Sequence, residues 1–109
     1  MRSMVEQLDP EIPAVMAAHA SVMGAVYGSE QSVALGQDIP LQKSIVANPA
    51  FDYVALGHVH KHQVLSTNPL TVYSGSIDRI DFGEERDEKG YVLAEVERGG
   101  ATYTFCPVK

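Results

Sequence analysis

The chain has 109 residues, of which 45% are hydrophobic and 20% are charged, and its formal net charge at pH 7 is -6. This length sets a ceiling of one domain, residues 1–109, built on one modest core. The acidic balance argues against a free-standing nucleic-acid-binding module, because neutralising phosphates requires a basic surface. It does not argue against an enzyme in which metal ions meet a phosphate group.

The cysteine content and the N-terminal segment bear on the compartment. The single cysteine, Cys106, cannot form an internal disulfide, so a secreted, cross-linked fold is not predicted. Its position at a strand end favours a small hydrophobic role, with a reactive thiol as the alternative. No long apolar run follows Asp9 and Glu11, so we expect neither a signal peptide nor a transmembrane helix, and a cytoplasmic protein without a membrane partner.

The first half of the chain predicts a strand, a loop, a helix and a second strand. Residues 14–18 form a short apolar run after a proline, which is typical of a strand buried on both faces. Glycines scattered through residues 24–37 predict a loop, and residues 41–47 predict a helix that an Asn-Pro pair ends. Residues 51–56 are again apolar and predict a second buried strand.

The second half predicts antiparallel hairpins. Residues 63–66 and 70–73 flank a Thr-Asn-Pro turn, and residues 91–96 and 101–105 alternate around Arg-Gly-Gly. Between them, the acidic residues 78–90 predict a solvated stretch. The order is strand, helix, strand and then hairpins, so the fold class is α/β with a mixed sheet.

Three histidines follow the two predicted buried strands. His58 and His60 come directly after residues 51–56, and extended residues two apart point to the same side. His19 occupies the matching place after residues 14–18. If the strands are parallel neighbours, the three side chains meet at the carboxyl ends of the strands, where α/β sheets bind ligands. Imidazole nitrogens suit zinc, iron and manganese, so a metal site is one interpretation.

The alternative is structural. A His-x-His pair occurs by chance, and a histidine after a strand is often an ordinary loop or core residue. For His62, which lies on the same side but also begins a hairpin, we favour a surface role or a contact behind the ligands.

Longer motifs make the interpretation specific. Residues 51–63, Phe-Asp-Tyr-Val-Ala-Leu-Gly-His-Val-His-Lys-His-Gln, resemble the last metal motif of the calcineurin-like metallophosphoesterases. Residues 72–85 resemble the SbcD-type DNA-repair exonucleases within that superfamily, and residues 18–30 resemble the penultimate metal motif of the same subfamily. The similarity runs from about residue 12 to residue 105, in the right order.

The resemblance implies a site for two divalent metals, most commonly manganese, in the complete protein. It assigns His19 and His58 to one ion and His60 to the other. The family's three earlier motifs, which supply the other ligands including a bridging aspartate, are absent from this sequence. We therefore predict no catalytic residue here, weak or no metal binding by the chain alone, and no activity. The expected fold is the mixed-sheet, C-terminal half of a metallophosphoesterase α/β sandwich, from a truncated, split or broken gene.

The segment Ser74, Gly75 and Ser76 has two interpretations. A turn with exposed amides can hold a phosphate oxygen, which makes these residues candidate substrate-binding residues. A glycine turn closing the hairpin is the structural alternative. Arg79 also has two interpretations, which are contact with the substrate and ion pairing with the acidic stretch.

The resemblance implies a DNA exonuclease and endonuclease subunit that hydrolyses phosphodiester bonds with an SbcC-type ATPase as partner. The alternatives are a metallophosphoesterase acting on small phosphodiesters or nucleotides, and a non-catalytic oligomerisation or binding module. Apolar first strands without their neighbours also predict self-association of the chain.

Overall fold

The computed structural model describes residues 5–23, 25, 41–76 and 88–108 of the chain. Its elements are β1 (Val15–His19), α3 (Lys43–Val46), β2 (Tyr53–Gly57), β3 (Gln63–Thr67), β4 (Leu70–Tyr73), β5 (Gly90–Glu97) and β6 (Gly100–Pro107). The predicted order of strand, helix, strand and hairpins is confirmed, and so is the mixed α/β class.

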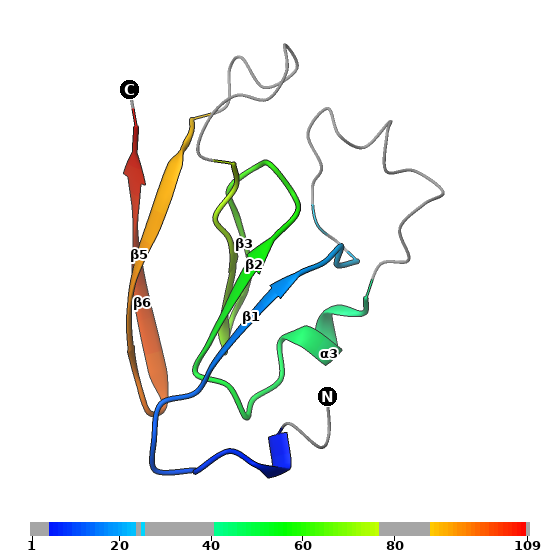
Figure 1. Cartoon of the computed structure of the whole chain (residues 1–109), viewed down its shortest axis with the longest axis vertical. Helices are drawn as coiled ribbons and strands as arrows, with labels where there is room; N and C mark the ends of the chain where they lie inside the picture. Colours follow the sequence, from blue (N-terminus) through cyan, green and yellow to red (C-terminus); the bar gives the residue numbers. More distant parts are fainter. Residues whose placement is uncertain (1–4, 24, 26–40, 77–87, 109) are drawn as a thin grey trace.

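A four-stranded mixed sheet, in the order β1-β2-β4-β3, forms the centre of the described structure. β2 runs parallel to both β1 and β4, whereas β3 is antiparallel to β4. β5 and β6 form a separate two-stranded hairpin, which Figure 1 shows standing alongside the sheet. The carboxyl ends of β1, β2 and β4 therefore lie at one end of the sheet.

Each face of β2 contributes to a different hydrophobic cluster, because successive side chains of a strand point to opposite faces. Val54 and Leu56 pack in the first cluster with Met16 and with Val46 of α3. The second cluster lies between the sheet and the hairpin. Its buried members are Tyr53, Leu70 and Val72, and its partly buried members are Ala55, Val92, Ala94, Val96, Ala101 and Tyr103.

The prediction that residues 14–18 are buried on both faces is wrong. Ala14 and Met16 are buried, but Val15 is 53% exposed and Ala17 is also exposed. In the described part of the chain β1 pairs only with β2, and the hairpin cluster contains no β1 residue. One face of β1 is therefore uncovered there.

Two other predictions need correction at their ends. The helix expected over residues 41–47 is a single turn, Lys43–Val46. The stretch predicted to be solvated lies outside the described residues up to residue 87, but Lys89 and Gly90 at its end are buried. The loop predicted over residues 24–37 lies outside the described residues, apart from Ala25.

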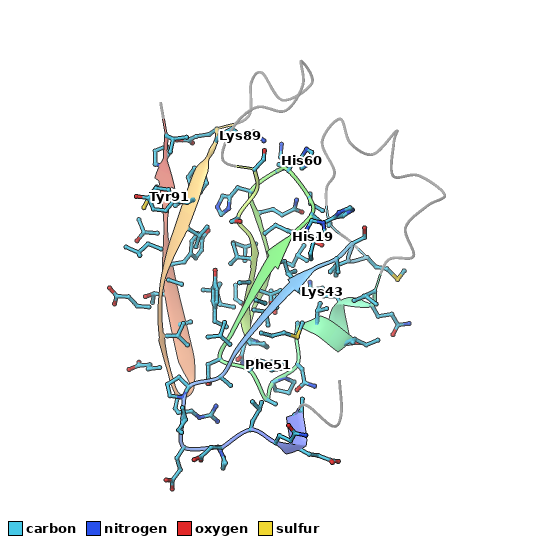
Figure 2. The ribbon with its side chains drawn as sticks, in the orientation of Figure 1. His19, Lys43, Phe51, His60, Lys89 and Tyr91 are labelled. Carbon is cyan, nitrogen blue, oxygen red and sulfur yellow. The ribbon has the colours of Figure 1, made fainter. Side chains whose placement is uncertain are left out.

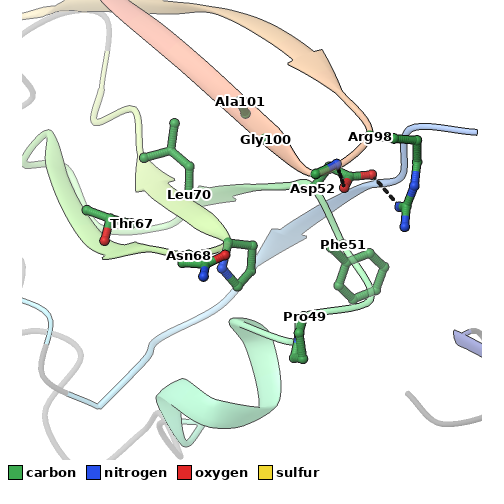
Figure 3. A pocket seen from close by; sticks show the side chains of 11 residues that line it. Pro49, Phe51, Asp52, Thr67, Asn68, Leu70, Arg98, Gly100 and Ala101 are labelled. Atoms are coloured by element: carbon green, nitrogen blue, oxygen red, sulfur yellow. Dashed lines mark hydrogen bonds and ion pairs between the residues drawn. The ribbon is translucent and has the colours of Figure 1, made fainter.

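Asp52 joins the hairpin to the amino-terminal end of the sheet. Its buried carboxylate accepts hydrogen bonds from the Ala14 amide (2.8 Å), the Gly99 amide (3.0 Å) and the Arg98 guanidinium (2.7 Å). It therefore ties the start of β1 to the β5–β6 turn. Figure 2 shows Phe51, its neighbour, at the end of the sheet opposite to His60, and Figure 3 shows the Asp52–Arg98 pair beside a pocket of about 200 Å³.

These contacts set the charge state of Asp52. The Ala14 amide, then the Gly99 amide, and the Arg98 guanidinium hold the pKa of the carboxyl below its ordinary value of 3.8, against the opposing effect of burial. Because the pKa is lower in the folded state, the stabilisation is complete above the unfolded value. It is lost as the pH falls through the folded value.

Asp52→Asn is expected to lower the melting temperature at pH 7, because the amide gives up one acceptor and the charge that faces Arg98. The gap between variant and wild type should begin to narrow below about pH 4, where the unfolded wild-type carboxylate takes up a proton, and should narrow further as the pH falls through the lower pKa of the folded state. Circular-dichroism melts between pH 7 and pH 2 measure this. Glu95→Gln, an exposed carboxylate on β5, is the control. Equal melting temperatures for Asp52→Asn and wild type at pH 7 would contradict the assigned role.

Candidate metal site at the ends of the parallel strands

The register of the parallel strands brings His19 beside the segment that follows β2. His19, the last residue of β1, is paired with Gly57, the last residue of β2. The Ala20 amide donates to the Gly57 carbonyl oxygen (3.2 Å), and the Tyr73 hydroxyl donates to the Ala20 carbonyl oxygen. The ends of three strands are thus bonded together. The prediction that His19, His58 and His60 meet at one strand-end edge is confirmed for the pair His19 and His58.

His58 is held in an unusual backbone conformation. Its φ is +106°, in the left-handed region that residues other than glycine rarely adopt. Such a conformation costs on the order of 1–3 kcal/mol and persists only where neighbouring structure imposes it. Here it turns the chain sharply after β2, and His58 Nδ1 lies 3.1 Å from His19 Nε2 with the rings at 76° to each other.

The separation of these nitrogens fits one divalent cation. Two imidazole nitrogens bound to the same ion at about 2.1 Å and at right angles lie about 3.0 Å apart. The measured distance also suits a hydrogen bond between the two rings, with one nitrogen as donor. The pair therefore supplies two ligands with suitable chemistry and spacing for a metal ion.

His60 lies at the same end of the sheet as His19 (Figure 2). Its carbonyl oxygen accepts hydrogen bonds from the Ser76 amide (3.0 Å), the Ser76 hydroxyl (3.5 Å) and the Lys89 ammonium (2.8 Å). Sequence reasoning missed Lys89, because it placed the residue in a solvated acidic stretch. The only signal for it was a lysine directly before a strand.

His62 has a packing role. Its Nδ1 lies 3.0 Å from the Tyr73 carbonyl oxygen, and its half-buried ring stacks on Phe105 with the centroids 4.3 Å apart. The Tyr103 ring lies edge-on to the His62 ring, with the centroids 5.7 Å apart. These contacts join the histidine turn, defined here as residues 58–62, to the hairpin. Of the two roles considered for His62, they favour a contact behind the candidate ligands over a surface role.

The loop after β4 packs against the histidine turn. The Ser74 amide donates to the Leu56 carbonyl oxygen (3.4 Å) and the Ser76 amide to that of His60, so both amides bond to the protein itself. A Cβ on Gly75, whose φ is +83°, would lie 2.8 Å from the His60 carbonyl oxygen and from the His62 nitrogen. These contacts favour the structural interpretation of the segment. Phosphate binding by Ser74, Gly75 and Ser76 stays a prediction.

A shallow hollow lies beside His19. Ala17, Ala55 and Gly57 line it together with Ser74 and the histidine itself. The small side chains of Ala17 and Ala55 leave room for it. Ser74 therefore lies near His19, even though its amide is occupied.

Among residues 5–23, 25, 41–76 and 88–108, no group of three or more His, Cys, Asp or Glu side chains is placed to hold a metal ion. Asp52, a buried carboxylate close to the motif in sequence, lies at the opposite end of β2 and is occupied by Ala14, Gly99 and Arg98. The described structure thus brings His19 and His58 together but adds no carboxylate to them.

Comparison with known proteins supports the motifs. No family model matches the chain. It is 38% identical over 85 residues, 75% of the chain, to the uncharacterized metallophosphoesterase YhaO of Bacillus subtilis. It is 29% identical over 107 residues, 97% of the chain, to the SbcD subunit of the SbcCD nuclease of Staphylococcus saprophyticus. The chain spans 19% of the length of the first relative and 28% of the second.

Two glycines with nearly the same positive φ offer a matched test of the packing around the histidine turn. Gly75 and Gly99 have φ values of +83° and +86°, but a Cβ on Gly99 would meet nothing within 4 Å. Gly99→Ala should cost about 1 kcal/mol of unfolding free energy, the backbone strain alone. Gly75→Ala should cost about 3 kcal/mol, because strain and overlap add. Chemical denaturation measures both costs. Equal costs would show that the loop at residues 74–76 is not tightly packed against the histidine turn.

Proposed function

We propose, from the premise that this chain is a homologue of the SbcD-type metallophosphoesterases, that it contributes part of a two-metal phosphodiesterase site. His19 and His58 would bind one divalent cation, and His60 would bind a second. The observation that supports this most is the 3.1 Å approach of His58 Nδ1 to His19 Nε2, held by a strained backbone at the ends of parallel strands.

When bound, divalent cations polarise a phosphoryl oxygen and lower the pKa of water, which is the chemistry of phosphodiester hydrolysis. The residues of this chain would hold and orient the histidine ligands. β1 and β2 fix His19 and His58 in register, and the Ser74–Ser76 loop supports the backbone of His60. Manganese is the proposed metal, since the resembled subfamily uses it and it is among the ions that act in two-metal sites.

The charge balance predicts that this chain alone binds metal weakly and is inactive. Neutral imidazoles offset none of the charge of two dications, whereas carboxylate ligands would offset part of it. In the described part of the chain no carboxylate joins the histidine pair. The remaining ligands would come from segments that correspond to other parts of the relatives, of whose lengths this chain spans 19% and 28%.

DNA is the proposed substrate of the complete site, with an SbcC-type ATPase as the partner. The similarity to the SbcD subunit of an SbcCD nuclease over 97% of the chain supports this. The alternative is hydrolysis of small phosphodiesters or nucleotides. The higher identity to a protein described only as a metallophosphoesterase keeps this alternative in view. The Gly75 to Glu85 motif, which favours the nuclease, lies mostly outside the described residues, and so does Arg79.

We also propose a cytoplasmic location and self-association of the chain. In the described residues no helix is long and apolar enough to span a membrane. The half-exposed Val15 on an edge strand supports association through β1. The net charge of -6 opposes it, and salt screens that repulsion beyond about 8–10 Å.

Manganese binding tests the proposed ligands directly. In imidazole proton NMR spectra, substoichiometric Mn²⁺ should broaden the His19 and His58 signals first and the His62 signal least. His58→Ala should weaken binding by about tenfold or more, because even the loss of a residue that only supports a ligand typically costs this much. Glu95→Gln, which removes a distant exposed carboxylate, should not change it. Equal broadening of all four histidines, unaffected by His58→Ala, would contradict the proposal.

Activity assays test the second part. With Mn²⁺, the isolated chain should hydrolyse neither linear duplex DNA nor a nitrophenyl phosphodiester above background, because the carboxylate ligands are missing. Manganese-dependent turnover that disappears in His58→Ala would show that the chain is active by itself. Activity that survives that substitution would come from a contaminant.

A further inference from the structure

Lys89 has a burial and a partner that its sequence position does not predict. The residue is only 3% exposed, and its ammonium donates a 2.8 Å hydrogen bond to the carbonyl oxygen of His60. Removing a charged group from water is unfavourable unless hydrogen bonds replace its hydration. A solvated lysine would need no buried hydrogen-bond acceptor. The burial of Lys89 against the His60 carbonyl oxygen therefore points to a structural role for its side chain.

The main chain of Lys89 is itself fixed. Its carbonyl oxygen accepts a hydrogen bond from the Val108 amide (2.8 Å), just beyond the end of β6. The next residue, Gly90, is paired with Pro107, and a Cβ there would overlap the Cys106 carbonyl group. The lysine therefore reaches out from a rigid point of the hairpin. Figure 2 shows it at the same end of the molecule as His60.

The other donors to the same oxygen come from a different element. The Ser76 amide and hydroxyl, on the loop after β4, also donate to the His60 carbonyl oxygen, at 3.0 and 3.5 Å. One carbonyl group thus receives donors from the sheet side and from the hairpin side. Together they fix the plane of the peptide that joins His60 to Lys61, and with it the direction in which the His60 side chain leaves the backbone.

We propose that Lys89 is a positioning residue for His60, which it holds in its place in the histidine turn through the charge-assisted bond to the His60 carbonyl oxygen. The inference rests on the proposed function in one respect, namely that His60 is a metal ligand. Lys89 acts through the backbone of His60 and does not itself bind metal. The hairpin then has a second role beside covering the sheet, because it braces the turn through Lys89 and through the ring stack of Phe105 on His62.

Amide hydrogen exchange of the metal-free chain tests the proposal. Lys89→Met keeps the length of the side chain and removes the donor. In that variant the Ser76 amide, bonded to the same oxygen, should exchange about tenfold faster, and the amides of the histidine turn should also accelerate. Core amides such as those of Val54 and Leu56 should change far less. Lys89→Arg, which keeps charge and donors, should restore most of the protection.

Lys43→Met is the matched control, since it removes an exposed lysine on α3. It should leave the Ser76 amide unchanged. A purely space-filling role for Lys89 predicts a uniform acceleration over the whole sheet in Lys89→Met and no rescue by arginine, and either result would overturn the proposal. Unchanged exchange at Ser76 would overturn it too.

A measurement on the wild-type chain covers the case in which Lys89→Met does not fold. The ammonium protons of Lys89 should exchange slowly with water and show a coupling across the hydrogen bond to the His60 carbonyl carbon. Fast exchange without that coupling would contradict the assignment. Both readouts need no metal, so a failure of manganese to bind would refute the proposed function and leave this result standing.

Discussion

The parallel pairing of β1 with β2 is the constraint on which the candidate site depends. Because the register joins His19 to Gly57, the ring of His19 meets the first residue after β2, and His58 turns back toward it with φ at +106°. A shift of one residue would move every side chain of β1 to the opposite face of the sheet. Ala14 and Met16 in the core fix the register at one end, and the Tyr73 bond to Ala20 fixes it at the other.

The hairpin β5–β6 turns a sheet that is open on one face into a layered structure with a supported edge. At one end, Asp52 accepts hydrogen bonds from Ala14, Gly99 and Arg98. At the other end, Lys89 and Phe105 contact the histidine turn. The cluster between sheet and hairpin is apolar enough that burial, with a smaller contribution from Tyr103, raises the pKa of Tyr53. The hairpin therefore contacts both the sheet and the histidine turn, at opposite ends of the molecule.

Sequence patterns predicted much of this fold because its signals are local. The Thr-Asn-Pro and Arg-Gly-Gly turns mark both hairpins, and the apolar runs mark β1 and β2. The exposure of Val15 could not be predicted, because an apolar run does not tell which neighbours the strand has. Lys89 was missed because its burial depends on a partner 29 residues away. The convergence of His19 and His58 was inferred only on the condition that their strands are parallel neighbours, and pairing is a property of the fold.

Strand register and a strained turn bring His19 and His58 together, and the proposed metal site depends on this pair. A crystal of the chain soaked in Mn²⁺, with diffraction recorded at the manganese absorption edge, tests this most directly. We expect an anomalous peak within bonding distance of both His19 Nε2 and His58 Nδ1. A peak bound to surface carboxylates alone, with the two histidine rings left facing each other, would contradict it.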